Sequence, residues 1–123
     1  MPSIVHFEIP ADNIERAQNF YAHVFNWKIE KAPGDYEYYS VITKNDENEP
    51  GIHGGMMKRQ DAEQTITNYI NVDSVDEYCT KVEKAGGKIL VPKSSVPGMG
   101  FFALCQDTEN NAFGFWMDDS TAT

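Results

Sequence analysis

The strongest constraint on the fold of this chain is a faint internal repeat. A shift of 61 positions, which carries residue 14 onto residue 75, superposes the apolar faces of two expected helices. The matched positions are Ile14, Ala17, Tyr21 and Val24 in the first helix and Val75, Tyr78, Val82 and Ala85 in the second. Identity between the halves is low, but the order of their elements repeats, so we expect two similar halves.

The first half has the pattern of a β-α-β-β-β unit. Alternating residues predict a strand over 4–9, which Pro10 ends, and Asp12 or Asn13 is expected to cap a helix. Strands are also expected over 27–31, 36–44 and 52–58, and Gly54-Gly55 in the last one leaves open space or admits a bulge. The helix carries one wide apolar stripe, formed by Ile14, Ala17, Phe20, Tyr21, Val24 and Phe25.

The second half repeats this order. It predicts a strand over 65–72, a helix over about 74–85 that stops at Gly86-Gly87, and strands over 88–91, 101–106 and 112–117. The expected class is therefore α+β, in which two βαβββ modules form a cup-shaped mixed sheet with the helices outside. A cup of this kind is where small molecules bind. We expect one domain over 1–123, with modules at about 1–60 and 64–119.

Composition and charge argue against several kinds of partner. The net charge is −9 and the ten Lys and Arg residues are scattered singly, which disfavours nucleic acid. No apolar stretch approaches a membrane span and the N-terminus has no secretory pattern, so neither a membrane nor secretion is indicated. Cys79 and Cys105 form no CxxC pair and are expected to be buried reduced thiols, which favours a cytoplasmic location.

Short motifs spread over nearly the whole chain carry a resemblance to a known family. In the first half they are 6–10 (His-Phe-Glu-Ile-Pro), Ala17, Phe20-Tyr21 and 24–27 (Val-Phe-Asn-Trp); in the second they are 72–75 (Val-Asp-Ser-Val), 85–88 (Ala-Gly-Gly-Lys) and 107–111 (Asp-Thr-Glu-Asn-Asn). In their order and spacing, the chain resembles the glyoxalase/bleomycin-resistance/dioxygenase superfamily, also called vicinal oxygen chelate proteins. The resemblance implies two βαβββ modules, a small-molecule cavity, often a divalent metal, and usually a homodimer.

The same resemblance implies a set of metal ligands that this sequence does not complete. Metal-dependent members place a His or a carboxylate on the first and last strand of each module, because several ligands must converge on the ion. His6 holds the first-strand position, but its equivalent in the second module is Thr67, and the last-strand carboxylate position is Gly114. His53 is the only plausible ligand for the fourth position. A divalent metal is therefore disfavoured, although His6 and His53 remain plausible ligands.

Strand alternation predicts which side chains face the cavity. Glu8 shares the face of His6, and the two are candidate acid–base residues; His6 is otherwise a histidine hydrogen-bonded inside a polar pocket. The other expected ligand-pocket residues are His53, Thr67, Tyr69, Asn71, Gly114 and Trp116. The opposite face is expected to build the core under the helices, from Val5, Phe7, Ile9, Ile70, Val72, Phe113, Phe115 and Met117, with Asn68 as an exception.

Three functions remain open from the sequence alone. The first is a small-molecule-binding protein of this superfamily without the full set of metal ligands. The second is a metal-dependent lyase, isomerase or dioxygenase that uses His6 with Glu8 or His53 around a divalent ion. The third is a structural, dimeric interaction module. The GxSxG, GxGxxG, P-loop and HExxH motifs do not occur, so serine hydrolase, Rossmann, phosphoryl-transfer and zincin chemistry have no sequence support.

Overall fold

The computed structural model describes residues 1–123, and the chain divides into two compact units. We call residues 6–66 the N-module; the C-module comprises residues 67–123 together with residues 1–5. Each is described in turn.

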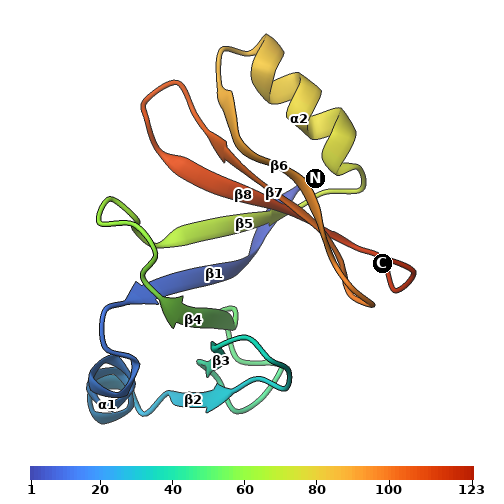
Figure 1. Cartoon of the computed structure of the whole chain (residues 1–123). Helices are drawn as coiled ribbons and strands as arrows, with labels where there is room; N and C mark the ends of the chain where they lie inside the picture. Colours follow the sequence, from blue (N-terminus) through green and yellow to red (C-terminus); the bar gives the residue numbers. More distant parts are fainter. The chain divides into compact units, whose positions relative to one another are not determined.

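Each module carries four strands and one helix (Figure 1). The elements of the first repeat are β1 (Ser3–Ala11), α1 (Ile14–Phe25), β2 (Lys28–Lys31), β3 (Tyr38–Ile42) and β4 (Gly54–Lys58). Those of the second are β5 (Thr67–Asn71), α2 (Val75–Lys84), β6 (Lys88–Val96), β7 (Gly100–Gln106) and β8 (Ala112–Asp118). The predicted α+β class and the β-α-β-β-β order of both halves are confirmed.

The two repeats use the same strand pairing. In the N-module the order is β2-β3-β4-β1, with β4 parallel to β1 and the other neighbours antiparallel. In the C-module the order is β5-β8-β7-β6, with β8 parallel to β5 and the other neighbours antiparallel. The first and last strands of each repeat therefore lie side by side. The two strands on which metal-dependent members place their ligands are thus neighbours within each module.

Both helices begin where the sequence predicts. The side chain of Asn13 accepts a hydrogen bond from the Arg16 amide at 2.9 Å, and the Ser74 hydroxyl accepts one from the Glu77 amide at 3.1 Å. These caps satisfy amides that the first helical turn leaves without an internal partner. The first helical residues, Ile14 and Val75, are 61 positions apart, as the repeat requires.

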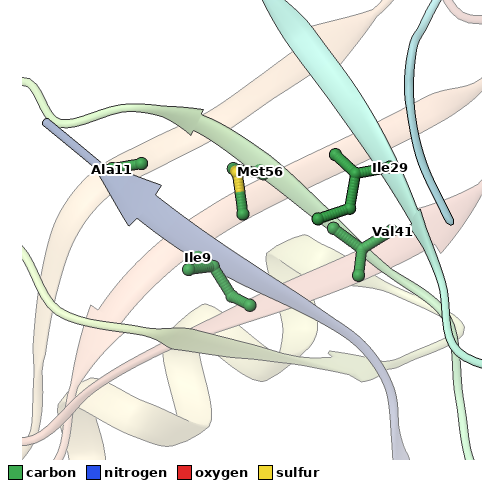
Figure 2. Packing of buried hydrophobic residues seen from close by; sticks show 5 residues of the cluster. All are labelled: Ile9, Ala11, Ile29, Val41 and Met56. Atoms are coloured by element: carbon green, nitrogen blue, oxygen red, sulfur yellow. The ribbon is translucent and has the colours of Figure 1, made fainter. Parts of the chain in front are cut away.

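The core of the N-module lies between α1 and the sheet. Figure 2 shows its buried side chains, which come from all four strands: Ile9, Ala11, Ile29, Val41 and Met56. From α1, Ile14, Ala17 and Tyr21 pack against this cluster, and Tyr21 stacks on Trp27 with ring centroids 5.4 Å apart. The predicted single wide stripe is only partly buried, because Phe20, Val24 and Phe25 are each more than half exposed.

The core of the C-module confirms the predicted strand faces. Ile70, Val72, Phe113, Phe115 and Met117 all belong to one cluster, and α2 covers it by packing against β6, β7 and β8 (Figure 1). Asn68, which interrupts this face in the sequence, is exposed at the start of β5. Cys79 and Cys105 are both free thiols in this cluster, and burial raises the pKa of Cys105 to about 12.

Several strand ends differ from the prediction. β1 continues through Pro10 to Ala11, because proline fits an extended backbone and removes only one donor from the ladder. β6 extends to Val96 instead of stopping at Val91, and its pairing with β7 shifts register between Ile89 and Val91 and again between Val91 and Ser94, the stretch that contains Pro92. A proline is tolerated there because β6 is the edge strand of its module. Neither helix is long and apolar enough to cross a membrane.

The core predicts a strong contrast between two neighbouring methionines. Met56 is fully buried, whereas Met57 lies on the other face of β4 and is only half-buried. Met56→Ala should lower the free energy of unfolding by about 2–5 kcal/mol, because it leaves a cavity in a close-packed cluster. Met57→Ala is the matched control and should cost less than half as much. Urea unfolding of the two variants measures the difference, and equal losses would contradict this placement of the core.

Candidate functional site

The register of three strands aligns the polar residues of the N-module. Glu8 on β1 is paired with Gly55 on β4, and Gly55 is paired with Ser40 on β3. Cross-strand partners point to the same face of a sheet, and so do residues two apart on one strand. His6 and Tyr38 therefore share this face with Glu8. It is the face opposite the N-module core.

A hydrogen-bonded chain joins three of these side chains. His6 Nε2 lies 2.8 Å from Tyr38 Oη, and the Tyr38 hydroxyl donates to Glu8 Oε2 at 3.0 Å. All three side chains are half-buried. The predicted acid–base pair, His6 and Glu8, is thus connected through a tyrosine that lies 32 residues along the chain from His6.

Gly55 makes room for this arrangement. A β-carbon at position 55 would lie 1.9 Å from Tyr38 Oη, much closer than two such atoms can approach. The pairing of β4 with β3 is continuous across Gly54 and Gly55, and its pairing with β1 begins at Gly55 without a shift of register, so the glycine pair provides open space and no bulge. The space at Gly54, on the core face, is filled in the same way by the ring of Phe7.

Burial sets the protonation of the network. It lowers the pKa of His6 below its usual 6.5, and the charge of Glu8 opposes this shift only in part. It also raises the pKa of Tyr38 far above its usual value, and Glu8 adds to this shift through its charge and its hydrogen bond. At neutral pH, His6 is therefore mainly neutral and Tyr38 keeps its proton.

His53 has different partners. It precedes β4, where its Nδ1 accepts a hydrogen bond from the Thr43 amide at 3.2 Å, and its Nε2 lies 3.8 Å from a carboxylate oxygen of Glu47. Both contacts are to the segment between β3 and β4.

The remaining predicted pocket residues lie in the C-module. Tyr69 is paired with Gly114, and Asn71 with Trp116, which puts all four on one face of β5 and β8. The ring of Tyr69 covers Gly114, since a β-carbon there would lie 2.5 Å from the ring. Tyr69 and Gly114 are both buried, whereas Asn71 is exposed. Trp116 donates its indole N–H to Asp118 at 2.8 Å, and Thr67 is half-buried at the start of β5.

The fold agrees with comparisons to known proteins. Residues 3–115 match the family model described as Glyoxalase/Bleomycin resistance protein/Dioxygenase superfamily. The chain belongs to this superfamily. A glyoxylase-like domain-containing protein from Didymella fabae is 31% identical to it, over 85% of this chain and 84% of that protein.

Solved structures with much lower identity share the fold. A glyoxalase/bleomycin resistance protein/dioxygenase superfamily member from Vibrio splendidus 12B01 is 14% identical, with a TM-score of 0.69 over 97% of this chain and all (100%) of that one. Methylmalonyl-CoA epimerase from Streptomyces coelicolor, in complex with 2-nitronate-propionyl-CoA, is 8% identical, with a TM-score of 0.69 over 98% of this chain and 97% of that one. These similarities concern the fold alone.

The residues at the superfamily's metal positions do not fit a chelated ion. In the N-module, His6 lies on the first strand, and the residue paired with Glu8 on the last strand is Gly55. His53, the residue expected at the fourth position, precedes that strand and contacts Thr43 and Glu47. In the C-module the corresponding residues are Thr67 and Gly114. The space beside each glycine is filled by a tyrosine, Tyr38 or Tyr69. Moreover, His, Cys, Asp and Glu side chains form no group of three or more that could hold a metal ion.

Tyr38 is the site residue that sequence analysis missed. In the sequence it belongs to an aromatic strand, in which any of three tyrosines could face the core. The available signal was Gly54-Gly55, because glycines inside a strand often mark a close approach of another group. That signal does not identify the approaching side chain, which depends on the register of β3 against β4.

Surface depressions of the N-module lie away from this network. One of about 530 Å³ is lined by Asp12, Glu37 and Lys58, among others, and one of about 380 Å³ by Arg16, Phe20 and Arg59, among others. Both surround the start of α1, and His6, Glu8 and Tyr38 line neither. The case for a site on the network face therefore rests on its chemistry.

The contact between Tyr38 and position 55 gives a test of the network. Gly55→Ala should displace the phenol and lower the free energy of unfolding by about 1–3 kcal/mol, as overpacking does. In a Tyr38→Ala background the same substitution should be neutral or slightly stabilising, because the obstructing ring is gone and alanine restricts the unfolded chain. Urea unfolding of the four proteins forms a double-mutant cycle. Equal costs in both backgrounds would mean that the two residues do not meet.

The lowered pKa of His6 makes stability depend on pH in a defined window. The unfolded chain binds more protons than the folded one between the folded pKa and 6.5, so the free energy of unfolding should fall as the pH drops below about 6.5. The loss ends once the pH is below the folded pKa. His6→Gln should remove this part of the slope, and His23→Gln, on exposed α1 surface, should leave it unchanged. Urea titrations between about pH 7.5 and pH 5 measure it; an unchanged slope in His6→Gln would refute the assignment.

Proposed function

We propose that this protein binds a small molecule on the face that carries His6, Tyr38 and Glu8, without chelating a metal. The observation that supports this most directly is the hydrogen-bonded chain through Tyr38 Oη, with contacts of 2.8 and 3.0 Å. Three half-buried polar side chains held in one geometry provide the directional contacts that fix a ligand's orientation.

The superfamily supports the small-molecule part of the proposal. A structural neighbour, methylmalonyl-CoA epimerase, holds a coenzyme A derivative, so the fold can accept such ligands. In the C-module the candidate ligand-pocket residues are Thr67, Tyr69, Asn71, Gly114 and Trp116, and in the N-module His53 directly precedes β4. Of the C-module residues, Thr67, Asn71 and Trp116 retain exposed surface for a ligand.

The filled ligand positions argue against the metal-dependent alternative. A glyoxalase-like lyase or a dioxygenase needs several donors on one ion. Here a carboxylate side chain at position 55 or 114 would collide with a tyrosine ring.

Metal-free acid–base catalysis is the second candidate function. His6 and Glu8 are joined through a hydroxyl that can pass a proton, and burial keeps His6 neutral at pH 7, in the form that accepts one. In this reading His6 and Glu8 act on a bound ligand that carries an acidic proton. Proton transfer would then require the same binding face, so binding is the part to test first.

Two further properties belong to the same proposal. We infer a homodimer, supported by Phe20, Val24 and Phe25, which leave an apolar patch exposed on α1. We also infer a cytoplasmic protein, supported by Cys79 and Cys105, which are neighbours yet remain unpaired thiols.

The proposal is tested on protein purified without added metal. Native mass spectrometry should give the mass of a dimer and any co-purified organic ligand, and plasma mass spectrometry should find no stoichiometric divalent ion. A screen of small polar aromatic compounds by ligand-observed NMR should then yield binders that His6→Ala and Tyr38→Phe weaken and that His23→Ala does not. About one divalent ion per chain, lost in His6→Ala, would contradict the proposal and favour the metal-dependent enzyme.

A further inference from the structure

The face of α2 that packs on the C-module sheet brings two cysteines together. Cys79 on α2 and Cys105 on β7 are free thiols in one buried cluster, and their side chains are hydrogen-bonded to each other. We propose that the pair is an oxidative modification site, which a hydroperoxide converts into a disulfide that joins α2 to β7. This proposal concerns the C-module alone and does not depend on the binding face of the N-module.

Packing holds the two cysteines on facing elements. α2 begins after its Ser74 cap and packs against β6, β7 and β8, with Val75, Tyr78 and Val82 in the cluster. Cys105 is fully buried on the face of β7 that α2 covers. Thiols that are already in contact on two packed elements need only a small movement to reach bonding distance.

Cys79 is the thiol that an oxidant reaches first. It retains some exposed surface, whereas Cys105 has none. Burial raises the pKa of both thiols, that of Cys105 to about 12, but their hydrogen bond lowers the pKa of Cys79 and raises that of Cys105. This is expected where Cys105 donates and the Cys79 sulfur accepts. The thiolate, which is the nucleophile in thiol oxidation, therefore forms more readily on Cys79.

The reaction balances with a hydroperoxide as the only co-reactant. The Cys79 thiolate attacks one peroxide oxygen, the O–O bond breaks, and the leaving oxygen takes the proton that Cys79 released, to become water or an alcohol. The Cys105 sulfur then attacks the sulfenic acid on Cys79, the S–O bond breaks, and the hydroxyl leaves as water with the Cys105 proton. Two electrons pass from the thiols to the peroxide, and a thiol reductant reverses the change.

The surroundings of Cys79 make this reaction slow near neutral pH. Burial is the main reason that its pKa lies above the usual value, and the carboxylates of Asp76 and Glu83 on the same helix add to the shift. On the facing strands, the neighbouring groups are Cys105 on β7 and Lys93 on β6, which pairs with Asp76 at 3.0 Å. The rate should therefore rise about tenfold per pH unit between about pH 7 and pH 9, with the thiolate fraction.

The test uses the whole purified protein, treated with hydrogen peroxide at about pH 8 and then denatured for thiol titration and peptide mass spectrometry. We expect both thiols to disappear together, tryptic peptides carrying Cys79 and Cys105 to be cross-linked within one chain, and dithiothreitol to restore both thiols. Oxygen addition to Cys79 while Cys105 stays reduced would overturn the proposal.

Two cysteine variants test the order of the steps. Cys105→Ala should accumulate a sulfenic acid on Cys79 that dimedone captures, because the second thiol is missing. Cys79→Ala should protect Cys105 from peroxide, since Cys105 has no exposed surface. Oxidation of Cys105 in Cys79→Ala at the rate of the unsubstituted protein would mean that Cys79 is not the point of attack, and the proposal would fail.

A comparison of two charge variants keeps the test valid if a cysteine variant does not fold. Glu83→Gln removes a carboxylate that raises the pKa of Cys79, so it should speed disulfide formation roughly twofold. Glu15→Gln makes the same change of net charge on α1, in the other module, and should leave the rate unchanged. Equal rates in both variants and in the unsubstituted protein, or a rate that does not rise with pH, would also refute the proposal.

Discussion

The register of β1, β4 and β3 is the constraint on which the chemistry of the N-module depends. Because Glu8, Gly55 and Ser40 lie in one row, Tyr38 can cross the sheet over a residue that has no side chain and reach both His6 and Glu8. A slip of one residue would turn the polar set of a strand toward the core. The same pairing buries Ile9, Val41 and Met56 on the opposite face, so one strand register determines both the core packing and the polar network.

This arrangement concerns the positions at which metal-dependent members of the superfamily place their ligands. Chelation uses the first and last strands of a module because they are neighbours, and here they are neighbours as well. The geometry that could hold an ion is thus present, but its space is taken by aromatic rings. A phenol over a glycine provides a hydroxyl that can donate and accept, which is suited to orienting a ligand or passing a proton.

The sequence predicted what depends on local pattern. The helices, the cap of the first one at Asn13, which was one of two residues expected there, and the faces of the first, fifth and eighth strands follow from periodicity and capping, which act over a few residues. Strand ends were less accurate. Pro10 was expected to end its strand and the sixth strand was expected to stop at Val91, but β1 continues through Pro10 and β6 through Pro92, where pairing outweighs the loss of one donor. The partial exposure of α1 was also missed, because periodicity gives the direction of a stripe and not how much of it a sheet covers.

The network was predictable only in part, and the two repeats show why. Glu8 and Tyr69 are equivalent, since each is the partner of the last-strand glycine of its module, Gly55 or Gly114. In the C-module Tyr69 covers that glycine from the first strand itself. In the N-module the covering tyrosine comes from β3, which leaves the first-strand position to a carboxylate.

Moving the aromatic ring to a neighbouring strand thus changes the chemistry of the module while preserving its packing. The C-module fills the place with the buried ring of Tyr69, and the N-module fills it with the phenol of Tyr38, which bonds a carboxylate and an imidazole. Sequence comparison of the halves shows Glu8 aligned with Tyr69, but the compensating residue lies on another strand, outside that alignment. The asymmetry between otherwise similar halves therefore leaves the N-module with two ionisable first-strand side chains, Glu8 and His6, joined through a tyrosine of another strand.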